Sequence, residues 1–330
     1  MIGAGTLLLN RSEVAKLLTL DETITAVENA FRLHGEGKAL KPALMHLCSN
    51  EGEFHIKAGG LELERRYVAI KANSGFFQNM TRLSLPNIRG LVILYDGDHG
   101  YPLAVLDSTE ITLKRTGAAV AIAARHLARP QSQVATIFGC GTQGRIQLHG
   151  LRSALPLRLV YAVDQDRNNA ESFAAQMSKE LSLKVLVAED TGEAIRRSDV
   201  CVTCTPSRNP FLWNTQVAKG TFIAAMGADS PEKQELDPEL LKANTVVVDL
   251  VDQCAEVGEL HHAMEAGMRK EDVHAELGEI VAGKKQGRTS INEIIIFDST
   301  GTALQDVASA AAVYRKALAG GYGALVDFLR

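Results

Sequence analysis

The chain has 330 residues, more than one ordinary hydrophobic core accommodates, so two domains are expected. Hydrophobic residues make up 46 % of it and charged residues 22 %, which is typical of a globular protein. The net charge of −4 gives no general attraction to nucleic acid or to an anionic membrane. No apolar run has membrane-spanning length, and the first residues lack a signal-peptide pattern. The five cysteines have no disulfide-framework spacing, which indicates reduced thiols in the cytoplasm.

The N-terminal part of the chain is predicted to be a domain of helices and strands. Ser12 or Arg11 is expected to begin the first helix, and Asp21 to be the N-cap of a second. A segment without any period is expected to be a loop. The predicted elements are helices within 11–36, strands at 54–58 and 67–72, a loop at 73–86, a hairpin of 90–95 with 102–106, and a helix over 112–127.

After Pro130, short apolar segments alternate with helical patterns. This alternation predicts an α/β domain with a mostly parallel, doubly wound sheet. The last predicted helix, 303–318, is expected to return to the first domain. We therefore expect one domain of residues 1–112 with 303–330 and another of residues 113–302. The strands are predicted at 134–138, 158–163, 184–188, 199–204, 221–226, 245–250 and 292–297.

A glycine-rich turn after the first of these strands carries the clearest functional pattern. Gly139, Gly141 and Gly144 have the G-x-G-x-x-G spacing between a strand and a helix. The first makes the turn, the second lets a pyrophosphate approach the backbone, and the third lets the helix pack closely. Asp164 ends the next strand and is suited to bind the ribose diol of NAD and to repel the 2′-phosphate of NADP. The alternative for Asp164 is a helix N-cap, a role that Asp166 fills at least as well.

Three cations and one acid are further candidates for chemistry. Lys57, Lys71 and Arg115 lie close to apolar strands or at the start of an apolar helix. Considered alone, Lys71 and Arg115 are expected at the surface, although an arginine can bind a carboxylate with two parallel hydrogen bonds. Asp229 follows the predicted strand 221–226, at the carboxyl end of the sheet where ligands bind. It is either a general acid or base or the residue of an Asx-turn or N-cap.

Two motifs with metal-ligand residues are not interpreted as metal sites. Cys201 and Cys204 have a C-x-x-C spacing but lie within a predicted core strand and lack a second pair of ligands. His261 and His262 are neighbours in a helical stretch, so their side chains are expected to point about 100° apart. No metal is therefore predicted.

Taken together, these segments resemble the ornithine cyclodeaminase/μ-crystallin family nearly end to end. That family includes cyclodeaminases, an alanine dehydrogenase, reductases of cyclic ketimines and imino acids, an enzyme group linked to ectoine breakdown, and an eye-lens crystallin. The resemblance implies an N-terminal α/β substrate-binding and dimerisation domain, completed by the C-terminal helix, and an NAD-binding Rossmann domain. The segments that carry it are Lys71, 90–94, 102–107, 112–118, the Gly139 turn, 203–206, 227–236, 258–261 and 298–301.

The resemblance also implies roles for individual residues. Arg115 resembles the arginine that binds the substrate α-carboxylate, and Lys71 the lysine beside that carboxylate and the reacting nitrogen. Asp229 resembles the catalytic aspartate of the cyclodeaminases. The positions that resemble cofactor-binding residues are Thr116, Gly139, Gly141, Thr142, Gln143, Gly144, Asp164, Thr205, Gly227 and Ser299.

One departure from the family pattern bears on the substrate. Cyclodeaminases carry a further arginine shortly after the proline that corresponds to Pro42, whereas this chain continues with residues 43–46, Ala-Leu-Met-His. Lys57 stands where many members have Met, and is a candidate for the missing substrate anchor. We therefore expect an NAD-dependent dehydrogenase or imine reductase acting on a small amino or imino acid, as a homodimer. The alternatives are a redox-neutral cyclodeaminase and a crystallin-like protein that binds the cofactor without turnover.

Overall fold

The N-terminal segment and the C-terminal helix fold together into one unit, and the middle of the chain forms another. The computed structural model describes residues 5–76 and 78–328. Met1–Ala4, where the sequence predicts no signal peptide, lie outside that part. The first unit comprises Met1–Arg115 and Thr302–Arg330, and the second Thr116–Gly301, so Arg115 belongs to the first. Among the described residues, no helix combines the length and the apolar composition that crossing a membrane requires.

The first unit is built on a seven-stranded sheet with the order β15-β1-β6-β5-β4-β3-β2. Neighbouring strands are antiparallel except β1 and β6, which are parallel. Side chains on its long strands alternate between a buried and an exposed face. The strands are β1 (Thr6–Leu9), β2 (Ala39–Cys48), β3 (Glu53–Glu62), β4 (Arg66–Gly75), β5 (Ile88–Asp96), β6 (Pro102–Asp107) and β15 (Ala324–Val326).

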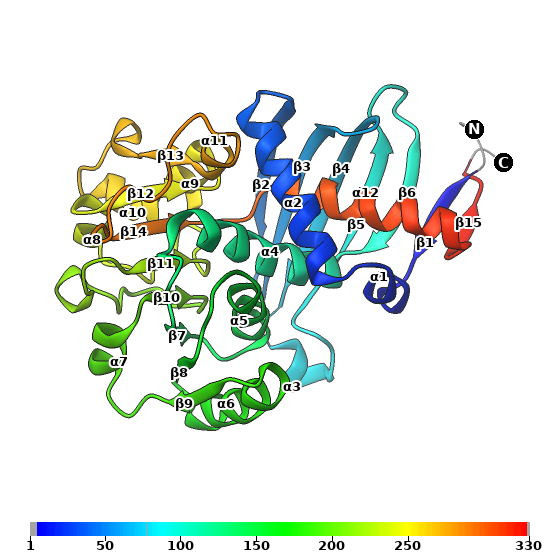
Figure 1. Ribbon diagram of the computed structural model, residues 1–330. Helices are drawn as coiled ribbons and strands as arrows, with labels where there is room; N and C mark the ends of the chain where they lie inside the picture. Colours follow the sequence, from blue (N-terminus) through cyan, green and yellow to red (C-terminus); the bar gives the residue numbers. More distant parts are fainter. Residues whose placement is uncertain (1–4, 77, 329–330) are drawn as a thin grey trace. The chain divides into compact units, whose positions relative to one another are not determined.

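Helix α12 (Ala303–Gly320) covers the buried face of this sheet. It packs on β3, β4 and β5, and α2 (Leu20–Gly35) lies alongside it (Figure 1). At Gly59 a Cβ atom would come 3.0 Å from the Cβ of Ala303, so the glycine permits the close approach of α12 to β3. The other helices that begin in this unit are α1 (Arg11–Leu17), α3 (Asn79–Leu83) and α4 (Thr109–Leu127), whose last residues belong to the second unit.

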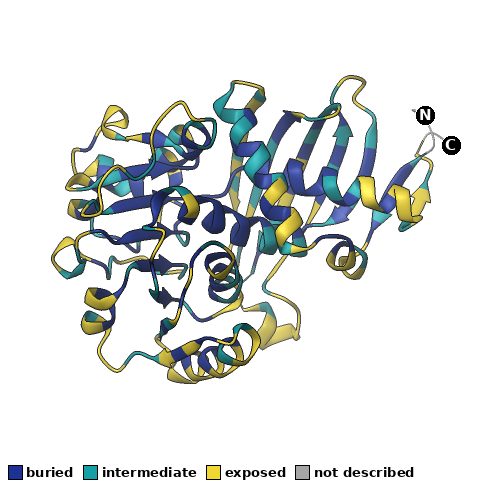
Figure 2. Cartoon of the chain, viewed as in Figure 1, coloured by how far each residue is buried: buried dark blue, intermediate teal, exposed yellow. Residues whose placement is uncertain are grey.

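The second unit is an eight-stranded parallel sheet with helices between its strands. Its order is β13-β12-β14-β11-β10-β7-β8-β9, and the central strands are buried along their length (Figure 2). The strands are β7 (Val134–Phe138), β8 (Leu159–Val163), β9 (Lys184–Val187), β10 (Val200–Thr203), β11 (Phe222–Ala225), β12 (Thr245–Val248), β13 (Ala275–Glu276) and β14 (Ile295–Asp298). The helices are α5 (Thr142–Ala154), α6 (Arg167–Leu181), α7 (Thr191–Arg197), α8 (Pro238–Lys242), α9 (Val251–Val257), α10 (Glu259–Glu265) and α11 (Leu277–Val281). The predicted Rossmann-type α/β fold is confirmed.

Several local predictions were wrong. Helix α1 begins at Arg11, as predicted, with Asn10 as its N-cap, but the N-cap of α2 is Thr19 instead of Asp21, and both caps form capping boxes. The strand β2 was missed because a proline and an irregular register between Leu40 and Ala43 interrupt its alternation. The segment predicted as a loop at 73–86 contains the end of β4 and the short helix α3. The strands β1, β13 and β15 were also missed; the structure gives them two to four residues each.

Candidate functional site

Two lysines lie buried on the face of the first sheet that α12 covers. Lys57 on β3 and Lys71 on β4 are direct cross-strand partners. Their exposed fractions are 5 % and 2 %, and Arg115 in α4 is 8 % exposed. The surface positions expected for Lys71 and Arg115 are therefore wrong. The predicted strand of Lys71 is correct, but the helix that covers it comes from more than two hundred residues further along the chain.

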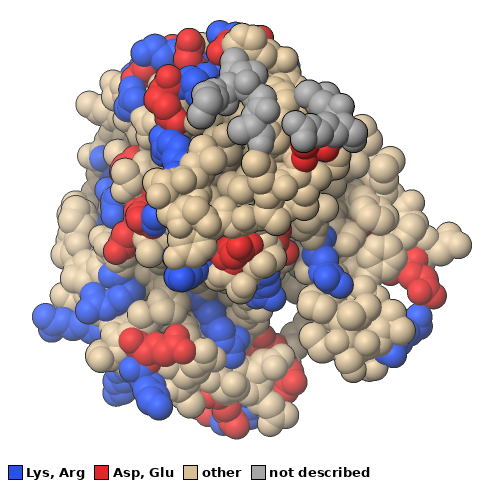
Figure 3. Space-filling view, turned by 90° about the vertical axis from the view of Figure 1, so that its right-hand side faces the viewer, with Lys and Arg blue, Asp and Glu red and all other residues tan. Residues whose placement is uncertain are grey.

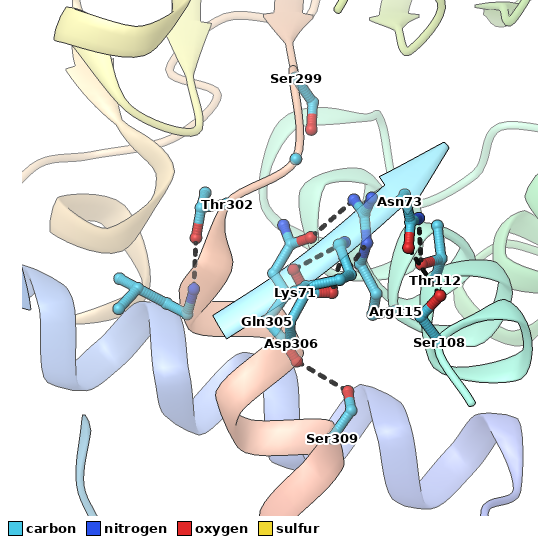
Figure 4. Close-up of polar contacts among 12 residues, drawn as sticks. Lys71, Asn73, Ser108, Thr112, Arg115, Ser299, Thr302, Gln305, Asp306 and Ser309 are labelled. Atoms are coloured by element: carbon cyan, nitrogen blue, oxygen red, sulfur yellow. Dashed lines mark hydrogen bonds and ion pairs between the residues drawn. The ribbon is translucent and has the colours of Figure 1, made fainter. Parts of the chain in front are cut away.

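Asp306 in the first turns of α12 is the anion in this cluster, and it was not predicted. Its Oδ1 and Oδ2 lie 2.8 and 2.7 Å from Nζ of Lys71. Nε of Arg115 lies 3.6 Å from Oδ1 of Asp306, and its Nη1 donates to Oε1 of Gln305 at 3.0 Å (Figure 4). The signal in the sequence was an acid within the alanine-rich run 303–313, where a carboxylate needs a buried partner.

The charges of the cluster act on the pKa of Lys71. Burial lowers this pKa to about 7, and the nearby positive charges of Arg115 and Lys57 lower it too, while Asp306 opposes them. A lysine with such a pKa exchanges a proton near neutral pH, which an ordinary surface lysine does not.

A hydrogen-bonded group fixes the start of α4, and with it Arg115. Asn73 follows Lys71 on the same face of β4 and accepts from Oγ of Ser108 at 2.6 Å. Its Nδ2 lies 3.3 Å from Oγ1 of Thr112, one helical turn before Arg115. Gly90 on β5 is required here, because a Cβ atom would come 2.2 Å from both the Ala72 carbonyl and the Asn73 side chain. The predicted residues Lys57, Lys71 and Arg115 thus lie together in one buried cluster.

In the second unit, the glycine turn has the geometry that its spacing predicts. Gly139 has φ +96°, in the left-handed region that favours glycine. At Gly144 a Cβ atom would come 2.0 Å from the Gly139 carbonyl oxygen, so only glycine fits there. Gly141 is the N-cap of α5 without a side-chain cap, and its Cβ position is open space. The turn therefore leaves the helix N-terminus accessible to a phosphate group.

A pocket of about 860 Å³ opens at this turn. It lies where the strand order reverses, since β8 and β10 flank β7 on opposite sides. The lining residues include Gly139, Gly141, Asp164 and Thr205 among those predicted, together with others such as Val163, Pro206 and Phe211. Thr142 and Gln143 form the first turn of α5, where Oε1 of Gln143 is buried without a hydrogen-bond partner among the described residues.

The position of Asp164 suits a ribose ring. Its Oδ2 accepts from the backbone N–H of Cys140 at 2.8 Å and its Oδ1 from that of Asp166 at 3.0 Å. The carboxylate is thus oriented, and each oxygen can accept a further hydrogen bond. Asp166 is the N-cap of α6, so the alternative role considered for Asp164 belongs to its neighbour. The pocket therefore offers groups suited to a dinucleotide, and the placement of its ribose diol at Asp164 and of its phosphates at the glycine turn stays a prediction.

Glu235 is a buried residue that the sequence did not single out. Its Oε1 accepts from N and Oγ1 of Thr205 at 2.6 and 2.7 Å, and its Oε2 from N of Gly227 at 3.1 Å. It thereby ties together the loops that follow β10 and β11. Glu259 in turn accepts from the backbone N–H of Glu235 at 2.8 Å. Burial raises the pKa of Glu235. No periodicity or motif marks this residue in the sequence.

The remaining predicted residues lie elsewhere in the second unit. Asp229 lies in the loop after β11, and its Oδ1 is 2.5 Å from Nζ of Lys233. Ser299 donates to Oδ2 of the buried Asp249 at 3.0 Å, and Thr116 is buried in α4. The catalytic, substrate-binding and cofactor-binding roles of the predicted residues stay predictions.

Of the two discounted motifs, the cysteine pair has the expected environment only in part. Cys201 is buried in β10 as predicted, but Cys204 follows the end of that strand and lines the pocket. Among the described residues the five cysteines form no disulfide. The expected divergence of His261 and His262 is wrong, because their ring centroids lie 5.1 Å apart in an edge-to-face arrangement. Successive residues of a helix start about 100° apart, so it is the side-chain torsions that bring the two rings together.

Comparisons with known proteins agree with this architecture. The ornithine cyclodeaminase/mu-crystallin family matches residues 5–321. An alanine dehydrogenase from Archaeoglobus fulgidus is 42 % identical over 98 % of this chain and 99 % of its own. The solved structure of an archaeal alanine dehydrogenase dimer with bound NAD has a TM-score of 0.93 at 42 % identity, and covers 98 % and 99 % of the two chains. A Δ(1)-pyrroline-2-carboxylate reductase from Thermococcus litoralis, in complex with NADH and L-proline, has a TM-score of 0.92 at 34 % identity over 97 % of this chain and all of the other.

Proposed function

Since the chain belongs to the ornithine cyclodeaminase/mu-crystallin family, we propose that it is an NAD-dependent oxidoreductase that acts on the C–N bond of a small α-amino or α-imino acid. The observation that carries this proposal is the buried cluster in which Lys71 and Arg115 contact the carboxylate of Asp306 and Lys57 lies across the strand pair from Lys71. A buried cluster of cationic side chains favours the binding of an anion. The α-carboxylate of an amino or imino acid supplies it.

Arg115 is the proposed anchor for that carboxylate. Its Nη1 donates to the neutral amide oxygen of Gln305, and its Nε has no hydrogen-bond partner among the described residues. The guanidinium therefore keeps donors for two parallel bonds to a carboxylate. Lys57 is the proposed second anchor. Its partner across the β2–β3 pair is Leu44, within the segment where cyclodeaminases carry an arginine.

Lys71 is the proposed group that exchanges a proton with the substrate nitrogen. Its pKa of about 7 lets it give a proton during imine reduction and accept one during amino acid oxidation. Asp229 is the other candidate for this role, although its carboxylate is paired with Lys233. Both roles are compatible with the proposed reaction, and the variants described in the Discussion distinguish them.

NAD is the cofactor, and when bound it accepts or gives the hydride. The residues that would hold it are the glycine turn for the phosphates and Asp164 for the ribose diol. A carboxylate at Asp164 repels a 2′-phosphate, which supports NAD over NADP. Glu235 would keep the Thr205 and Gly227 loops in one conformation around the pocket.

We further propose that two copies of the chain associate through the uncovered face of the first sheet. Side chains on that face are apolar across four neighbouring strands and are 37 % to 53 % exposed. A contiguous apolar face of this kind is typical of an interface. The exposed apolar residues of this face are Met45, Leu47, Phe54, Ile70 and Leu91.

Charged side chains of both signs are interspersed on the face shown in Figure 3, which gives no support for a nucleic-acid partner. The unpaired cysteines support a reducing compartment, the cytoplasm.

A spectroscopic screen tests the proposed activity. Amino acids, keto acids with ammonia or methylamine, and cyclic imino acids are combined with NAD, NADH or NADPH, and the absorbance of NADH is followed. We expect stoichiometric consumption of NADH with an imino substrate, and NADH formation from the amino acid at high pH. Release of ammonia from ornithine or lysine with only catalytic NAD would instead identify a cyclodeaminase. Binding of NADH without turnover of any substrate would identify a crystallin-like protein.

A further inference from the structure

A second cluster of chemically active side chains lies on the hairpin formed by β2 and β3. His46 and His55 are direct cross-strand partners, and Glu53 precedes His55 by two residues on the same face of β3. Nε2 of His46 lies 3.1 Å from Oε2 of Glu53, and Nε2 of His55 lies 3.2 Å from Oε1. The imidazole centroids are 4.5 Å apart with the rings tilted by 31°. Two imidazoles thus direct their Nε2 atoms at one carboxylate.

This arrangement brings three electron-pair donors together. The candidate ligand atoms of His46, Glu53 and His55 all lie within 4.8 Å of one another. Two ligands of a tetrahedral zinc ion, each with a bond of about 2.1 Å, are about 3.4 Å apart. The two nitrogen–oxygen distances are close to that value and end on the two different oxygens of Glu53, so a rotation of this carboxylate is needed to bring one oxygen and both nitrogens around one ion. Without a metal ion, these contacts are hydrogen bonds in which each imidazole donates an Nε2–H to the Glu53 carboxylate.

We propose that His46, Glu53 and His55 bind a divalent transition-metal ion of the Zn²⁺ class. Two imidazoles and one carboxylate are a ligand set that such ions accept, and three protein ligands leave a coordination position open. The side chains are 23 %, 19 % and 13 % exposed, so an ion can enter while the ligands stay packed. This site is independent of the proposed redox function, although Lys57 follows His55 on the same face of β3.

A second group of similar composition serves as the internal comparison. His261 and His262 lie 3.7 and 3.8 Å from the carboxylate of Glu265, which is 67 % exposed. Ordering an exposed glutamate costs side-chain entropy. The nitrogen–oxygen distances of this second group are also longer than those of the hairpin cluster. The hairpin cluster is therefore expected to bind a metal ion more tightly than this second group.

Metal binding by the full-length protein tests the proposal. The protein is stripped with a chelator, and Zn²⁺ is titrated by equilibrium dialysis; Co²⁺ is titrated separately and followed by its visible absorption. We expect one tight Zn²⁺ per chain, and a weakening of more than about 100-fold in both His46→Ala and His55→Ala. The matched control, His261→Ala, is expected to bind as the parent does. Because β2 is the edge strand of the sheet, His46→Ala is expected to fold, which its circular dichroism and melting temperature check.

Three outcomes would overturn the proposal. The first is that the parent protein binds no Zn²⁺ at micromolar concentrations. The second is that binding survives in both hairpin variants or is lost in His261→Ala. The third is that the Co²⁺ spectrum contains the intense charge-transfer bands of a thiolate ligand, because the proposed ligands are nitrogen and oxygen only. A d–d spectrum without thiolate bands that disappears in His55→Ala supports the site.

Discussion

Replacing Asp306 with asparagine is expected to lower the pKa of Lys71 further. In the parent protein, burial has already brought this pKa to about 7, and Asp306 is the group that opposes the decrease. The variant keeps the shape and a hydrogen-bond acceptor beside Nζ but removes the negative charge. Imine reduction needs the protonated amine under the proposed function, so its rate falls as the pH rises through the pKa of Lys71. In Asp306→Asn this fall is expected at lower pH.

The size of the shift follows from the geometry of the pair. A charge pair at 2.7 Å interacts by about 6 kcal/mol at an effective dielectric constant near 20, which corresponds to about four pKa units. That value is an upper limit, because the amide still accepts a hydrogen bond and the site relaxes. We expect a displacement of at least about one pH unit, equivalent to about 1.4 kcal/mol. At neutral pH the variant then has most of its Lys71 in the neutral form.

The assay is kcat/KM for NADH-dependent reduction of a cyclic imino acid across a range of pH. A cyclic substrate is used because open-chain imines require ammonia, whose own ionisation distorts the profile. The parameter kcat/KM reports the ionisations of the free enzyme and substrate. In Lys71→Met, the decrease of kcat/KM caused by the ionisation of Lys71 is expected to disappear. In Asp229→Asn, the pH of this decrease is expected to stay unchanged. If the decrease of kcat/KM with rising pH stays in place or moves to higher pH in Asp306→Asn, the reasoning is refuted. If this decrease instead shifts or disappears in Asp229→Asn, the proton is assigned to Asp229.

Substitutions at three further residues test the other parts of the site. The parent protein is expected to prefer NADH over NADPH at least about tenfold in kcat/KM, since 1.4 kcal/mol of repulsion at Asp164 suffices; Asp164→Ala should then gain activity with NADPH, and no gain contradicts the role. Arg115→Ala should lose about 2–5 kcal/mol of transition-state stabilisation, and Arg115→Lys should recover little of it. The NADH affinity of both variants, measured by fluorescence, should stay nearly constant. Activity of Arg115→Ala within threefold of the parent contradicts the role of Arg115. Glu235→Gln should raise the dissociation constant of NADH, because the amide keeps only one acceptor oxygen and its NH₂ group cannot accept the hydrogen bond from the other loop, that of Thr205 or that of Gly227. Unchanged NADH affinity contradicts a role of Glu235 in cofactor binding.

The second unit was largely predictable because its signals are local. Each strand is a short apolar run, and the spacing of the turn already indicated its glycines, of which Gly139 and Gly144 have a steric reason. Asp164 was identifiable because it ends the strand after the turn. Glu235 was not, because its partners are backbone N–H groups of Thr205 and Gly227 that only the folded loops bring to it.

The cation cluster of the first unit could not be predicted from local pattern. Alternation along β4 puts Lys71 on the same face as Tyr67 and Ala69, and the structure shows that face to be buried. The local sequence does not indicate which element covers this face. Helix α12 folds back from the far end of the chain onto it and places Asp306 beside Lys71. The resemblance to a known family implied roles for Lys71 and Arg115, and the departure from its pattern made Lys57 a candidate anchor, but neither pointed to the carboxylate of Asp306.

The balance of charge in this cluster links substrate binding to proton transfer. Without a substrate, Arg115 and Lys57 lower the pKa of Lys71, and Asp306 only partly opposes them. Under the proposed function, the substrate carboxylate adds a negative charge beside the same cations. That charge raises the pKa of Lys71, so the bound complex favours the protonated amine that imine reduction requires. Binding of an imino acid is then accompanied by proton uptake near neutral pH, and transfer of that proton to the substrate nitrogen during reduction restores the neutral amine.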